Sequence, residues 1–160
     1  MAITQKISPF LWFKDSAEEA ARFYVSLFPN SKVVEATRIE EIPGGIPGKA
    51  TTVSFQLDGV EFIAFNGGPH FQFTEAVSLW VHCDGQDEVD RLWDALIADG
   101  GAPSQCGWLK DRYGLSWQIV PDVMIKLMAD KDRAKGKRVM EAMLKMTKID
   151  IAAIKRAYEG

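Results

Sequence analysis

The chain has 160 residues, of which 47% are hydrophobic and 26% charged, and its formal net charge is −3 at pH 7. A chain of this length can bury roughly 70% of its unfolded surface without disulfide or metal staples, and 19 basic against 22 acidic side chains do not favour nucleic acid as a partner. The first residues do not have the pattern of a signal peptide, so we expect none. The sequence also lacks the run of ~18 apolar residues that spans a membrane. Its two cysteines, Cys83 and Cys106, fit a reducing compartment. We therefore expect a cytoplasmic globular protein without a membrane partner.

The first part of the chain predicts a strand, a helix, a second strand and a hairpin. Asp15 or Ser16 is the expected helix cap, and Pro29 is the expected stop. Asp58-Gly59 is a strong signal for a type I′ turn between two alternating strands. The predicted elements are, in order, strand 7–13, helix 17–28, strand 32–39, a Gly/Pro-rich surface loop at 41–50, and hairpin strands 52–57 and 60–65.

The next part predicts the same order of elements after a linker at 66–73. A helix with apolar residues at helical spacing ends at Gly100-Gly101. Residues 111–114 are expected to form an exposed hairpin turn. The predicted strands are 76–82, 105–110 and 115–120, with a short strand between the helix and the hairpin.

These two parts are also related residue by residue. Residues 11–28 and 79–97 each join an apolar run, a turn with a capping Asp and a helix, and they lie about 68 residues apart, which is too long for a solenoid repeat. The repeat predicts an α+β fold of two tandem βαβββ modules, residues 1–73 and 74–121, with a functional site where the halves meet. The matched pairs are Leu11/Leu79, Trp12/Trp80, Asp15/Asp84, Glu19/Glu88, Arg22/Arg91 and Leu27/Leu96.

The remaining segment, 122–160, predicts a helical tail. Pro121 is expected to break the last strand, Asp132 to cap a basic amphipathic helix and Asp150 to cap a short final helix. We expect the apolar stripe of the basic helix to pack on the domain or on a partner subunit, although such helices also bind membrane surfaces. The stripe consists of Val139, Met140, Met143, Leu144 and Met146.

Several strings make the chain resemble a known family. The tandem βαβββ order, together with FLWF, EEAARFYVSLFPNS, FQLDG, FNGGPHFQF, CGWLKDRYGLSWQIVP and KIDIAAIKRAY, is similar to the PhnB-like family of the vicinal oxygen chelate (glyoxalase/bleomycin-resistance) superfamily. The usual label of that family is demethylubiquinone 3-methyltransferase domain. The resemblance implies curved mixed sheets around a concave cleft, C-terminal helices after them, and a homodimer, with modules exchanged between chains in some members.

The resemblance also implies where a metal would bind. Metal enzymes of the superfamily place His and Glu ligands on the first and last strands of each module, and the last-strand ligand follows the hairpin glycine by four residues. The positions counted along this chain are Ser8, Ile63, Ala76 and Gln118. Because Ser, Ile, Ala and Gln side chains do not form a binding site for a divalent metal ion, we expect no metal and no cofactor. A relocated metal site with His70 and Glu61 or Glu75 is the alternative.

Strand alternation gives the expected lining of the cleft. Leu11, Phe13, Leu79 and Val81 should face the helices, and the alternate residues should face a ligand, with Glu61 and Val120 on the same face. The competing interpretation is that Trp12 and Trp80 fill this face as core. The expected ligand-binding residues are Ser8, Phe10, Trp12, Ile63, Phe65, Asn66, His70, Ser78, Trp80, Ser116 and Gln118.

His70 is the candidate catalytic residue of the linker that follows Asn66. Glycines before it would let the backbone approach a ligand, and a histidine can act there as general base or hydrogen-bond donor. A structural turn between the modules is the competing interpretation.

The function that these observations favour is metal-independent binding of a flat or partly aromatic small molecule of unknown identity. The alternatives are methyl transfer to demethylubiquinone, as the family label implies, a metal-dependent glyoxalase-like lyase or dioxygenase with relocated ligands, and a purely structural or interaction role. The loop PGGIPG precedes a strand rather than a helix, which is unlike a nucleotide-cofactor loop. Whether the protein is an enzyme stays open at this point.

Overall fold

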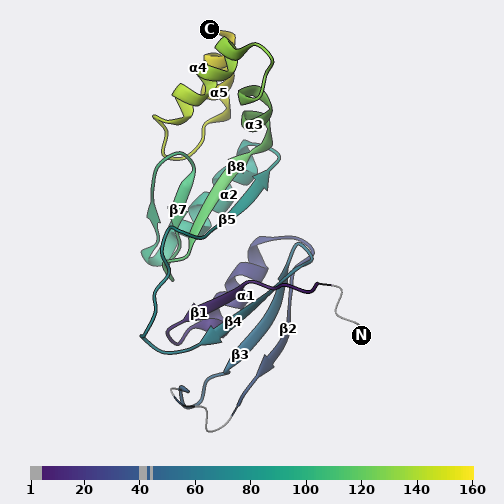
Figure 1. Cartoon of the computed structure of the whole chain (residues 1–160), viewed down its shortest axis with the longest axis vertical. Helices are drawn as coiled ribbons and strands as arrows, with labels where there is room; N and C mark the ends of the chain where they lie inside the picture. Colours follow the sequence, from purple (N-terminus) through teal and green to yellow (C-terminus); the bar gives the residue numbers. More distant parts are fainter. Residues whose placement is uncertain (1–4, 40–42, 44) are drawn as a thin grey trace. The chain divides into compact units, whose positions relative to one another are not determined.

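The computed structural model describes residues 5–39, 43 and 45–160 and divides the chain into two compact units, Met1–Gln72 and Phe73–Gly160. Each unit contains a four-stranded mixed sheet with strands in the order βαβββ along the chain, and three helices follow in the second unit (Figure 1). The predicted α+β fold of two tandem βαβββ modules with C-terminal helices is therefore confirmed.

The first unit pairs its first strand with its last. The sheet order is β1-β4-β3-β2, with β1 parallel to β4 and the other pairs antiparallel. Asp58 and Gly59 both have positive φ, 47° and 79°, as a type I′ turn requires, so this prediction is confirmed. The elements are β1 (Phe10–Phe13), α1 (Ala17–Leu27), β2 (Lys32–Thr37), β3 (Thr52–Leu57) and β4 (Val60–Asn66).

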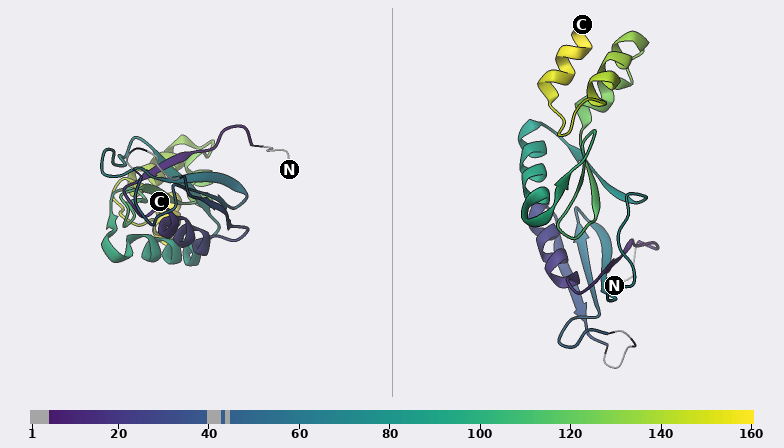
Figure 2. Two further views of the ribbon diagram at one scale, coloured as in Figure 1. Left: turned by 90° about the horizontal axis from the view of Figure 1, so that it is seen from below. Right: turned by 90° about the vertical axis from the view of Figure 1, so that its left-hand side faces the viewer.

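Helix α1 covers one face of this sheet, as the right-hand view of Figure 2 shows. Leu11 and Phe13 of β1 point to that face and are buried, whereas Phe10 is 54% exposed. Phe55 stacks on Phe62 beneath the helix, with ring centroids 5.4 Å apart. Each fully buried side chain of this size contributes roughly 1.5–3 kcal/mol. The expected helix face is confirmed, with Ala17, Ala20, Ala21, Tyr24 and Leu27 buried.

Strand β1 begins at Phe10 rather than at the predicted residue 7. The side-chain amide of Gln5 accepts a hydrogen bond from the Glu61 N–H at 3.0 Å and donates one to the Glu61 carbonyl at 2.9 Å. These are the β4 backbone groups that a longer β1 would have paired with, so the strand ladder starts later. The preceding Ile7 is 85% exposed.

The N-terminus of α1 is closed by a residue from β4. Ser16 occupies the N-cap position, as expected, but makes no side-chain cap bond. Instead Asn66, only 3% exposed, accepts from the Ala17 N–H at 2.8 Å and donates to the Ala50 carbonyl at 2.9 Å. The side chain of Asn66, expected to contact a ligand, thus joins the helix to the sheet.

The second unit repeats the pairing with the order β5-β8-β7-β6, and β5 is parallel to β8. The N-cap of α2 is Gly85 without a side-chain bond, so the predicted cap by Asp84 is wrong. Helix α2 ends at Ile97 and is followed by a 3-10 turn, Ala98–Gly100. The elements are β5 (Ser78–Cys83), α2 (Gln86–Ile97), β6 (Ala102–Pro103), β7 (Trp108–Lys110) and β8 (Ser116–Pro121).

The turn between β7 and β8 is held by a buried carboxylate. Asp111, expected in an exposed turn, is 2% exposed. It accepts hydrogen bonds from the N–H groups of Tyr113 (2.8 Å) and Leu115 (3.1 Å) and from the indole N–H of Trp117 (2.9 Å). Hydrogen bonds to a charged acceptor are about twice as strong as neutral ones, so Asp111 fixes both the turn and the core tryptophan.

The tail consists of α3 (Asp122–Met128), α4 (Arg133–Met143) and α5 (Ile151–Glu159). Helix α3 is not among the predicted elements. Pro121, expected only to break the last strand, pairs with Cys83 and is also the N-cap of α3. Asp132 and Asp150 cap α4 and α5 through their side chains, which confirms both predicted caps. In the described part of the chain, no helix is long and apolar enough to cross a membrane.

The tail packs on the end of the second sheet. Gln86 of α2 accepts from the Ile151 N–H at 2.8 Å and donates to the Ile149 carbonyl at 3.1 Å, and Lys148 pairs with Asp90 at 2.7 Å. Met140 and Leu144, members of the expected stripe, stay 41% and 56% exposed. The buried contacts join Val120, Met124, Val139, Ile149 and Ile154.

Replacing Asn66 with Ala should destabilise the first unit by about 1–3 kcal/mol, because the Ala17 N–H and Ala50 carbonyl lose a buried partner. Urea unfolding followed by the ¹⁹F resonance of Trp12 in 5-fluorotryptophan-labelled protein reports on this unit, since the other four tryptophans lie after residue 72. Ser54→Ala, which removes one exposed hydrogen bond from the same sheet, should change stability by less than about 0.5 kcal/mol. Equal effects of the two substitutions would contradict the role of Asn66.

The two cysteines should differ in reactivity. Cys83 is fully buried, and burial, with the Glu88 carboxylate nearby, raises the pKa of its thiol to about 12. Because the thiolate is the nucleophile, Ellman's reagent should modify the partly exposed Cys106 rapidly and Cys83 only after unfolding. A fast reaction that persists in Cys106→Ser would disprove this assignment.

Candidate functional site

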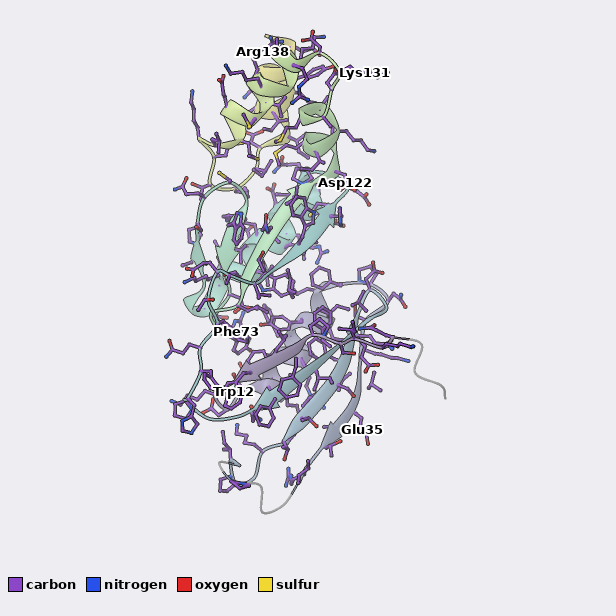
Figure 3. The ribbon with its side chains drawn as sticks, viewed as in Figure 1. Trp12, Glu35, Phe73, Asp122, Lys131 and Arg138 are labelled. Carbon is purple, nitrogen blue, oxygen red and sulfur yellow. The ribbon has the colours of Figure 1, made fainter. Side chains whose placement is uncertain are left out.

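Four aromatic side chains gather on the face of the first sheet opposite α1. Trp12 (labelled in Figure 3) makes edge-to-face contacts with Phe65 and Phe71, with ring centroids 5.0 and 4.9 Å apart. Phe10 lies 5.3 Å from Phe65. Phe10 and Phe71 are 54% and 65% exposed. We call Phe10, Trp12, Phe65 and Phe71 the ring cluster.

The orientation of Trp12 is fixed by the backbone that follows β4. Its indole N–H donates to the Gly68 carbonyl at 2.9 Å. A Cβ at Gly67 would lie 2.3 Å from two ring atoms of Trp12 and 2.6 Å from the Phe65 ring, so a side chain there would displace both rings. Edge-to-face aromatic pairs add about 0.5–1.5 kcal/mol beyond burial. The indole is therefore held in place before any ligand arrives.

A polar depression of about 580 Å³ lies on the same unit and brings together two of the predicted residues, Ser8 and Ile63. Ile63 pairs with Phe10 of the ring cluster in the β1–β4 ladder. Gln5 donates to the Ser8 hydroxyl at 3.4 Å. Lys6 and Glu61 complete the lining, so the depression offers a hydroxyl and one charge of each sign.

The corresponding face of the second sheet carries Ser78, Trp80 and Gln118. The Gln118 amide donates to the Ser78 hydroxyl at 3.0 Å, and Trp80 is 45% exposed. Ser116, predicted on this face, is only 1% exposed, and its hydroxyl has no hydrogen-bond partner among the residues that the structure describes. The exposed part of this face therefore consists of Trp80 and the Ser78–Gln118 pair.

Two further residues change the composition of this second face. Val120 was expected to line it, but Val120 is 3% exposed because the tail helices cover it. His82, at the end of the predicted strand, was not among the expected lining residues, although it shares the strand alternation of Ser78 and Trp80; its ring centroid lies 6.0 Å from that of Trp80. Its Nδ1 lies 2.9 Å from Oδ1 of Asp122. The parity of β5 could have identified His82, but Asp122 depends on the unexpected α3.

The expected metal-ligand positions on the last strand of each module, β4 and β8, were counted from the hairpin glycines, and this count aligns the two strands incorrectly. Trp12 pairs with Phe65, whereas the equivalent Trp80 pairs with Gln118. The counterpart of Gln118 is therefore Phe65, and the expectation that Ile63 matches Gln118 is wrong. The cause is the longer second turn: Leu57 pairs directly with Val60, but Lys110 pairs with Ser116. By this register, Ile63 corresponds to Ser116.

The side chains at the superfamily's metal positions do not fit a divalent ion. Ser8 offers one neutral hydroxyl, Ile63 and Ala76 offer no donor, and the Gln118 amide is bonded to Ser78. Structural and catalytic sites use three or more His, Cys, Asp or Glu ligands, and no such group of three forms among the described residues. The corrected register, with Ser116 in place of Gln118, adds only another hydroxyl.

His70 lies in an exposed turn after β4, outside both sheets. Gly68 before it has φ of +81°, which glycine adopts without strain. The expected loop at 41–50 falls partly on residues 41, 42 and 44, which lie outside the described residues.

Comparison with known proteins agrees with the architecture. The profile of a family described as 3-demethylubiquinone-9 3-methyltransferase matches residues 5–120. The PhnB protein from Bacillus cereus is 37% identical over 73% of this chain and 99% of its own, with a TM-score of 0.67. No curated protein matches the chain. The family match ends before α3, so the tail lies beyond it.

More distant structures share the fold. A protein from Pseudomonas aeruginosa is 19% identical over 74% of this chain and 98% of its own, with a TM-score of 0.60. The fosfomycin resistance protein FosX from Listeria monocytogenes, solved with Mn(II) and sulfate, is 15% identical over 72% of this chain and 90% of its own, with a TM-score of 0.52. FosX and this chain thus share a fold, and the chain belongs to the 3-demethylubiquinone-9 3-methyltransferase (PhnB-like) family.

Proposed function

We propose that this protein binds a flat, partly aromatic small molecule on the ring cluster of its first sheet, without a metal ion. The observation that carries the proposal is the ring cluster itself, in which partly exposed rings surround a tryptophan whose orientation is fixed by Gly67 and Gly68. Large exposed aromatic groups that are already ordered are typical of binding surfaces.

The energetics favour a planar ligand. Each Å² of apolar surface removed from water contributes about 25 cal/mol, and a flat ring can pack on the partly exposed rings of Phe10 or Phe71. Since Trp12 is already held by its hydrogen bond and by ring contacts, binding does not have to order it.

The polar depression supplies orientation. Because Phe10 and Ile63 are ladder partners, a ligand on the ring cluster can extend a polar group toward the Ser8 hydroxyl and the Lys6 ammonium group, which line the depression. The Gln5 amide is already engaged by the Glu61 backbone. We therefore favour a ligand with one acceptor or anionic group at the edge of an aromatic ring.

Metal independence rests on the donor set at the superfamily positions. Mn(II) belongs to the description of FosX, whereas the residues here are Ser8, Ile63, Ala76 and Gln118. Hydroxyl, amide and aliphatic side chains hold divalent transition metals poorly. The ligand-binding residues kept in the proposal are Ser8, Phe10, Trp12, Ile63 and Phe65 in the first unit.

We propose in addition that the protein forms a homodimer and lies in the cytoplasm. The family resemblance supports a homodimer, and two free cysteines without a disulfide support a reducing cytoplasmic environment. Sedimentation of the purified protein over a range of concentrations distinguishes dimer from monomer.

The ring cluster should bind naphthalene-2-carboxylate, a planar probe with one anionic edge. With 5-fluorotryptophan incorporated, the chain gives a ¹⁹F resonance for each of its 5 tryptophans, and the Trp12 resonance should shift on titration. Phe65→Leu, which removes an edge-to-face partner of Trp12, should weaken binding by about tenfold, equivalent to about 1.4 kcal/mol.

The matched control is Phe62→Leu, on the same strand but on the core face. It should lower stability and leave the probe affinity unchanged. A Trp12 resonance that does not respond to the probe, or equal losses of affinity in both variants, would refute the proposed site.

Methyl transfer, which the family description names, predicts binding of S-adenosylmethionine. Nucleotide-bearing cofactors often bind at a glycine-rich turn between a strand and a helix. The connections into α1 and α2 are Lys14-Asp15-Ser16 and Asp84-Gly85, and neither has this pattern. We therefore expect calorimetric titration with S-adenosylmethionine to give no binding heat, whereas saturable binding would favour the methyltransferase.

A further inference from the structure

His82 is placed beside an exposed aromatic ring on the second sheet. Ser78, Trp80 and His82 alternate along β5 and share the face opposite α2, because Cys83 on the other face is fully buried. The Trp80 and His82 ring centroids lie 6.0 Å apart at an interplanar angle of 46°. The side chain of His82 is 71% exposed, so a ligand can reach it.

The carboxylate of Asp122 orients the imidazole of His82. Asp122 is the first residue of α3, directly after Pro121, which pairs with Cys83 in the sheet; Figure 3 labels it where β8 passes into this helix. Its Oδ1 lies 2.9 Å from Nδ1 of His82. An ionised carboxylate can only accept a hydrogen bond, so Nδ1 carries the proton, and a neutral His82 has its lone pair on Nε2.

The neighbours of His82 within the second sheet are uncharged. Across the ladder, His82 lies opposite Val120 and Trp80 lies opposite Gln118. On α3, the charged residues are Asp122 and the exposed Lys126. The Asp122 carboxylate therefore provides the compensating charge for an imidazolium at His82.

We propose that His82, Asp122 and Trp80 form a proton-accepting subsite for a planar ligand with an acidic hydroxyl group, such as a phenol. The ring of the ligand packs on Trp80, and its O–H donates to Nε2 of His82. The O–H proton moves to Nε2, the bonding pair stays on the ligand oxygen, and the resulting phenolate is held by the imidazolium. Asp122 is a positioning residue in this step and stabilises the imidazolium.

An ordinary surface ion pair is the competing explanation of the His82–Asp122 contact, and exposed pairs contribute little to stability. One observation favours a site instead. The pair lies next to the large, half-exposed ring of Trp80, on the sheet face opposite α2. The proposal is independent of the ring cluster, because all its residues lie in the second unit.

The first test is the tautomer of His82, which needs no ligand. The chain has 2 histidines, so a long-range ¹H–¹⁵N spectrum contains two imidazole patterns, assigned with His70→Gln. We expect neutral His82 to carry its proton on Nδ1. In Asp122→Asn this preference should weaken, because an amide can also donate to Nδ1. A wild-type His82 protonated on Nε2 overturns the proposal.

The second test uses 4-nitrophenol, whose phenolate absorbs at longer wavelength than the phenol. At a fixed pH at which the free probe is only partly ionised and a histidine can still accept a proton, the wild-type protein should increase the phenolate band in a saturable titration. His82→Gln should abolish this increase, and Trp80→Leu should weaken probe affinity by about tenfold, as expected for losing an aromatic contact and its buried area.

The control variant is His70→Gln, which removes the other histidine and should keep the increase at wild-type strength. No increase with the wild-type protein, or an increase that survives His82→Gln, refutes the subsite. Trp12→Leu alters the ring cluster of the first unit, and loss of the increase in this variant alone would place the probe there and also refute the subsite. Naphthalene-2-carboxylate has no hydroxyl group, so its binding tests the ring cluster independently of this subsite.

Discussion

The parallel pairing of the first strand with the last strand of each unit is the constraint on which both candidate sites depend. In the first unit it sets Phe10 beside Ile63 and Trp12 beside Phe65, and in the second it sets Trp80 beside Gln118. Residues far apart in sequence thereby become neighbours on one face, because side chains alternate across a strand. Without this pairing the aromatic and polar residues would not form a surface.

Each unit places a helix on one face of its sheet, and this decides which residues remain accessible. Helices α1 and α2 bury the aliphatic side of the strands, such as Leu11 and Ile119. The opposite side keeps Phe10 and Trp80 about half exposed. In the first unit this open side has become aromatic and rigid, since Gly67 leaves room for the indole of Trp12. In the second, the tail covers part of it at Val120 and adds Asp122.

Much of the architecture could be predicted from local patterns. The strand alternation identified the buried Leu11 and Phe13, Asp58-Gly59 identified its turn, and Asp132 and Asp150 identified two helix caps. These signals are local, because a turn or a cap is decided by a few neighbouring residues. Asn66 could not be interpreted in this way, since its side chain is satisfied by Ala17 and Ala50, which are distant in sequence.

The sequence by itself determined the order of elements and the internal repeat, because these depend on residue type and spacing. The tertiary structure decided the register, in which the longer turn after Lys110 makes Gln118 the counterpart of Phe65 rather than of Ile63. It also decided that Val120 is covered and that Asp122 meets His82. Burial and long-range hydrogen bonds arise from packing between segments, and a local pattern does not contain that information.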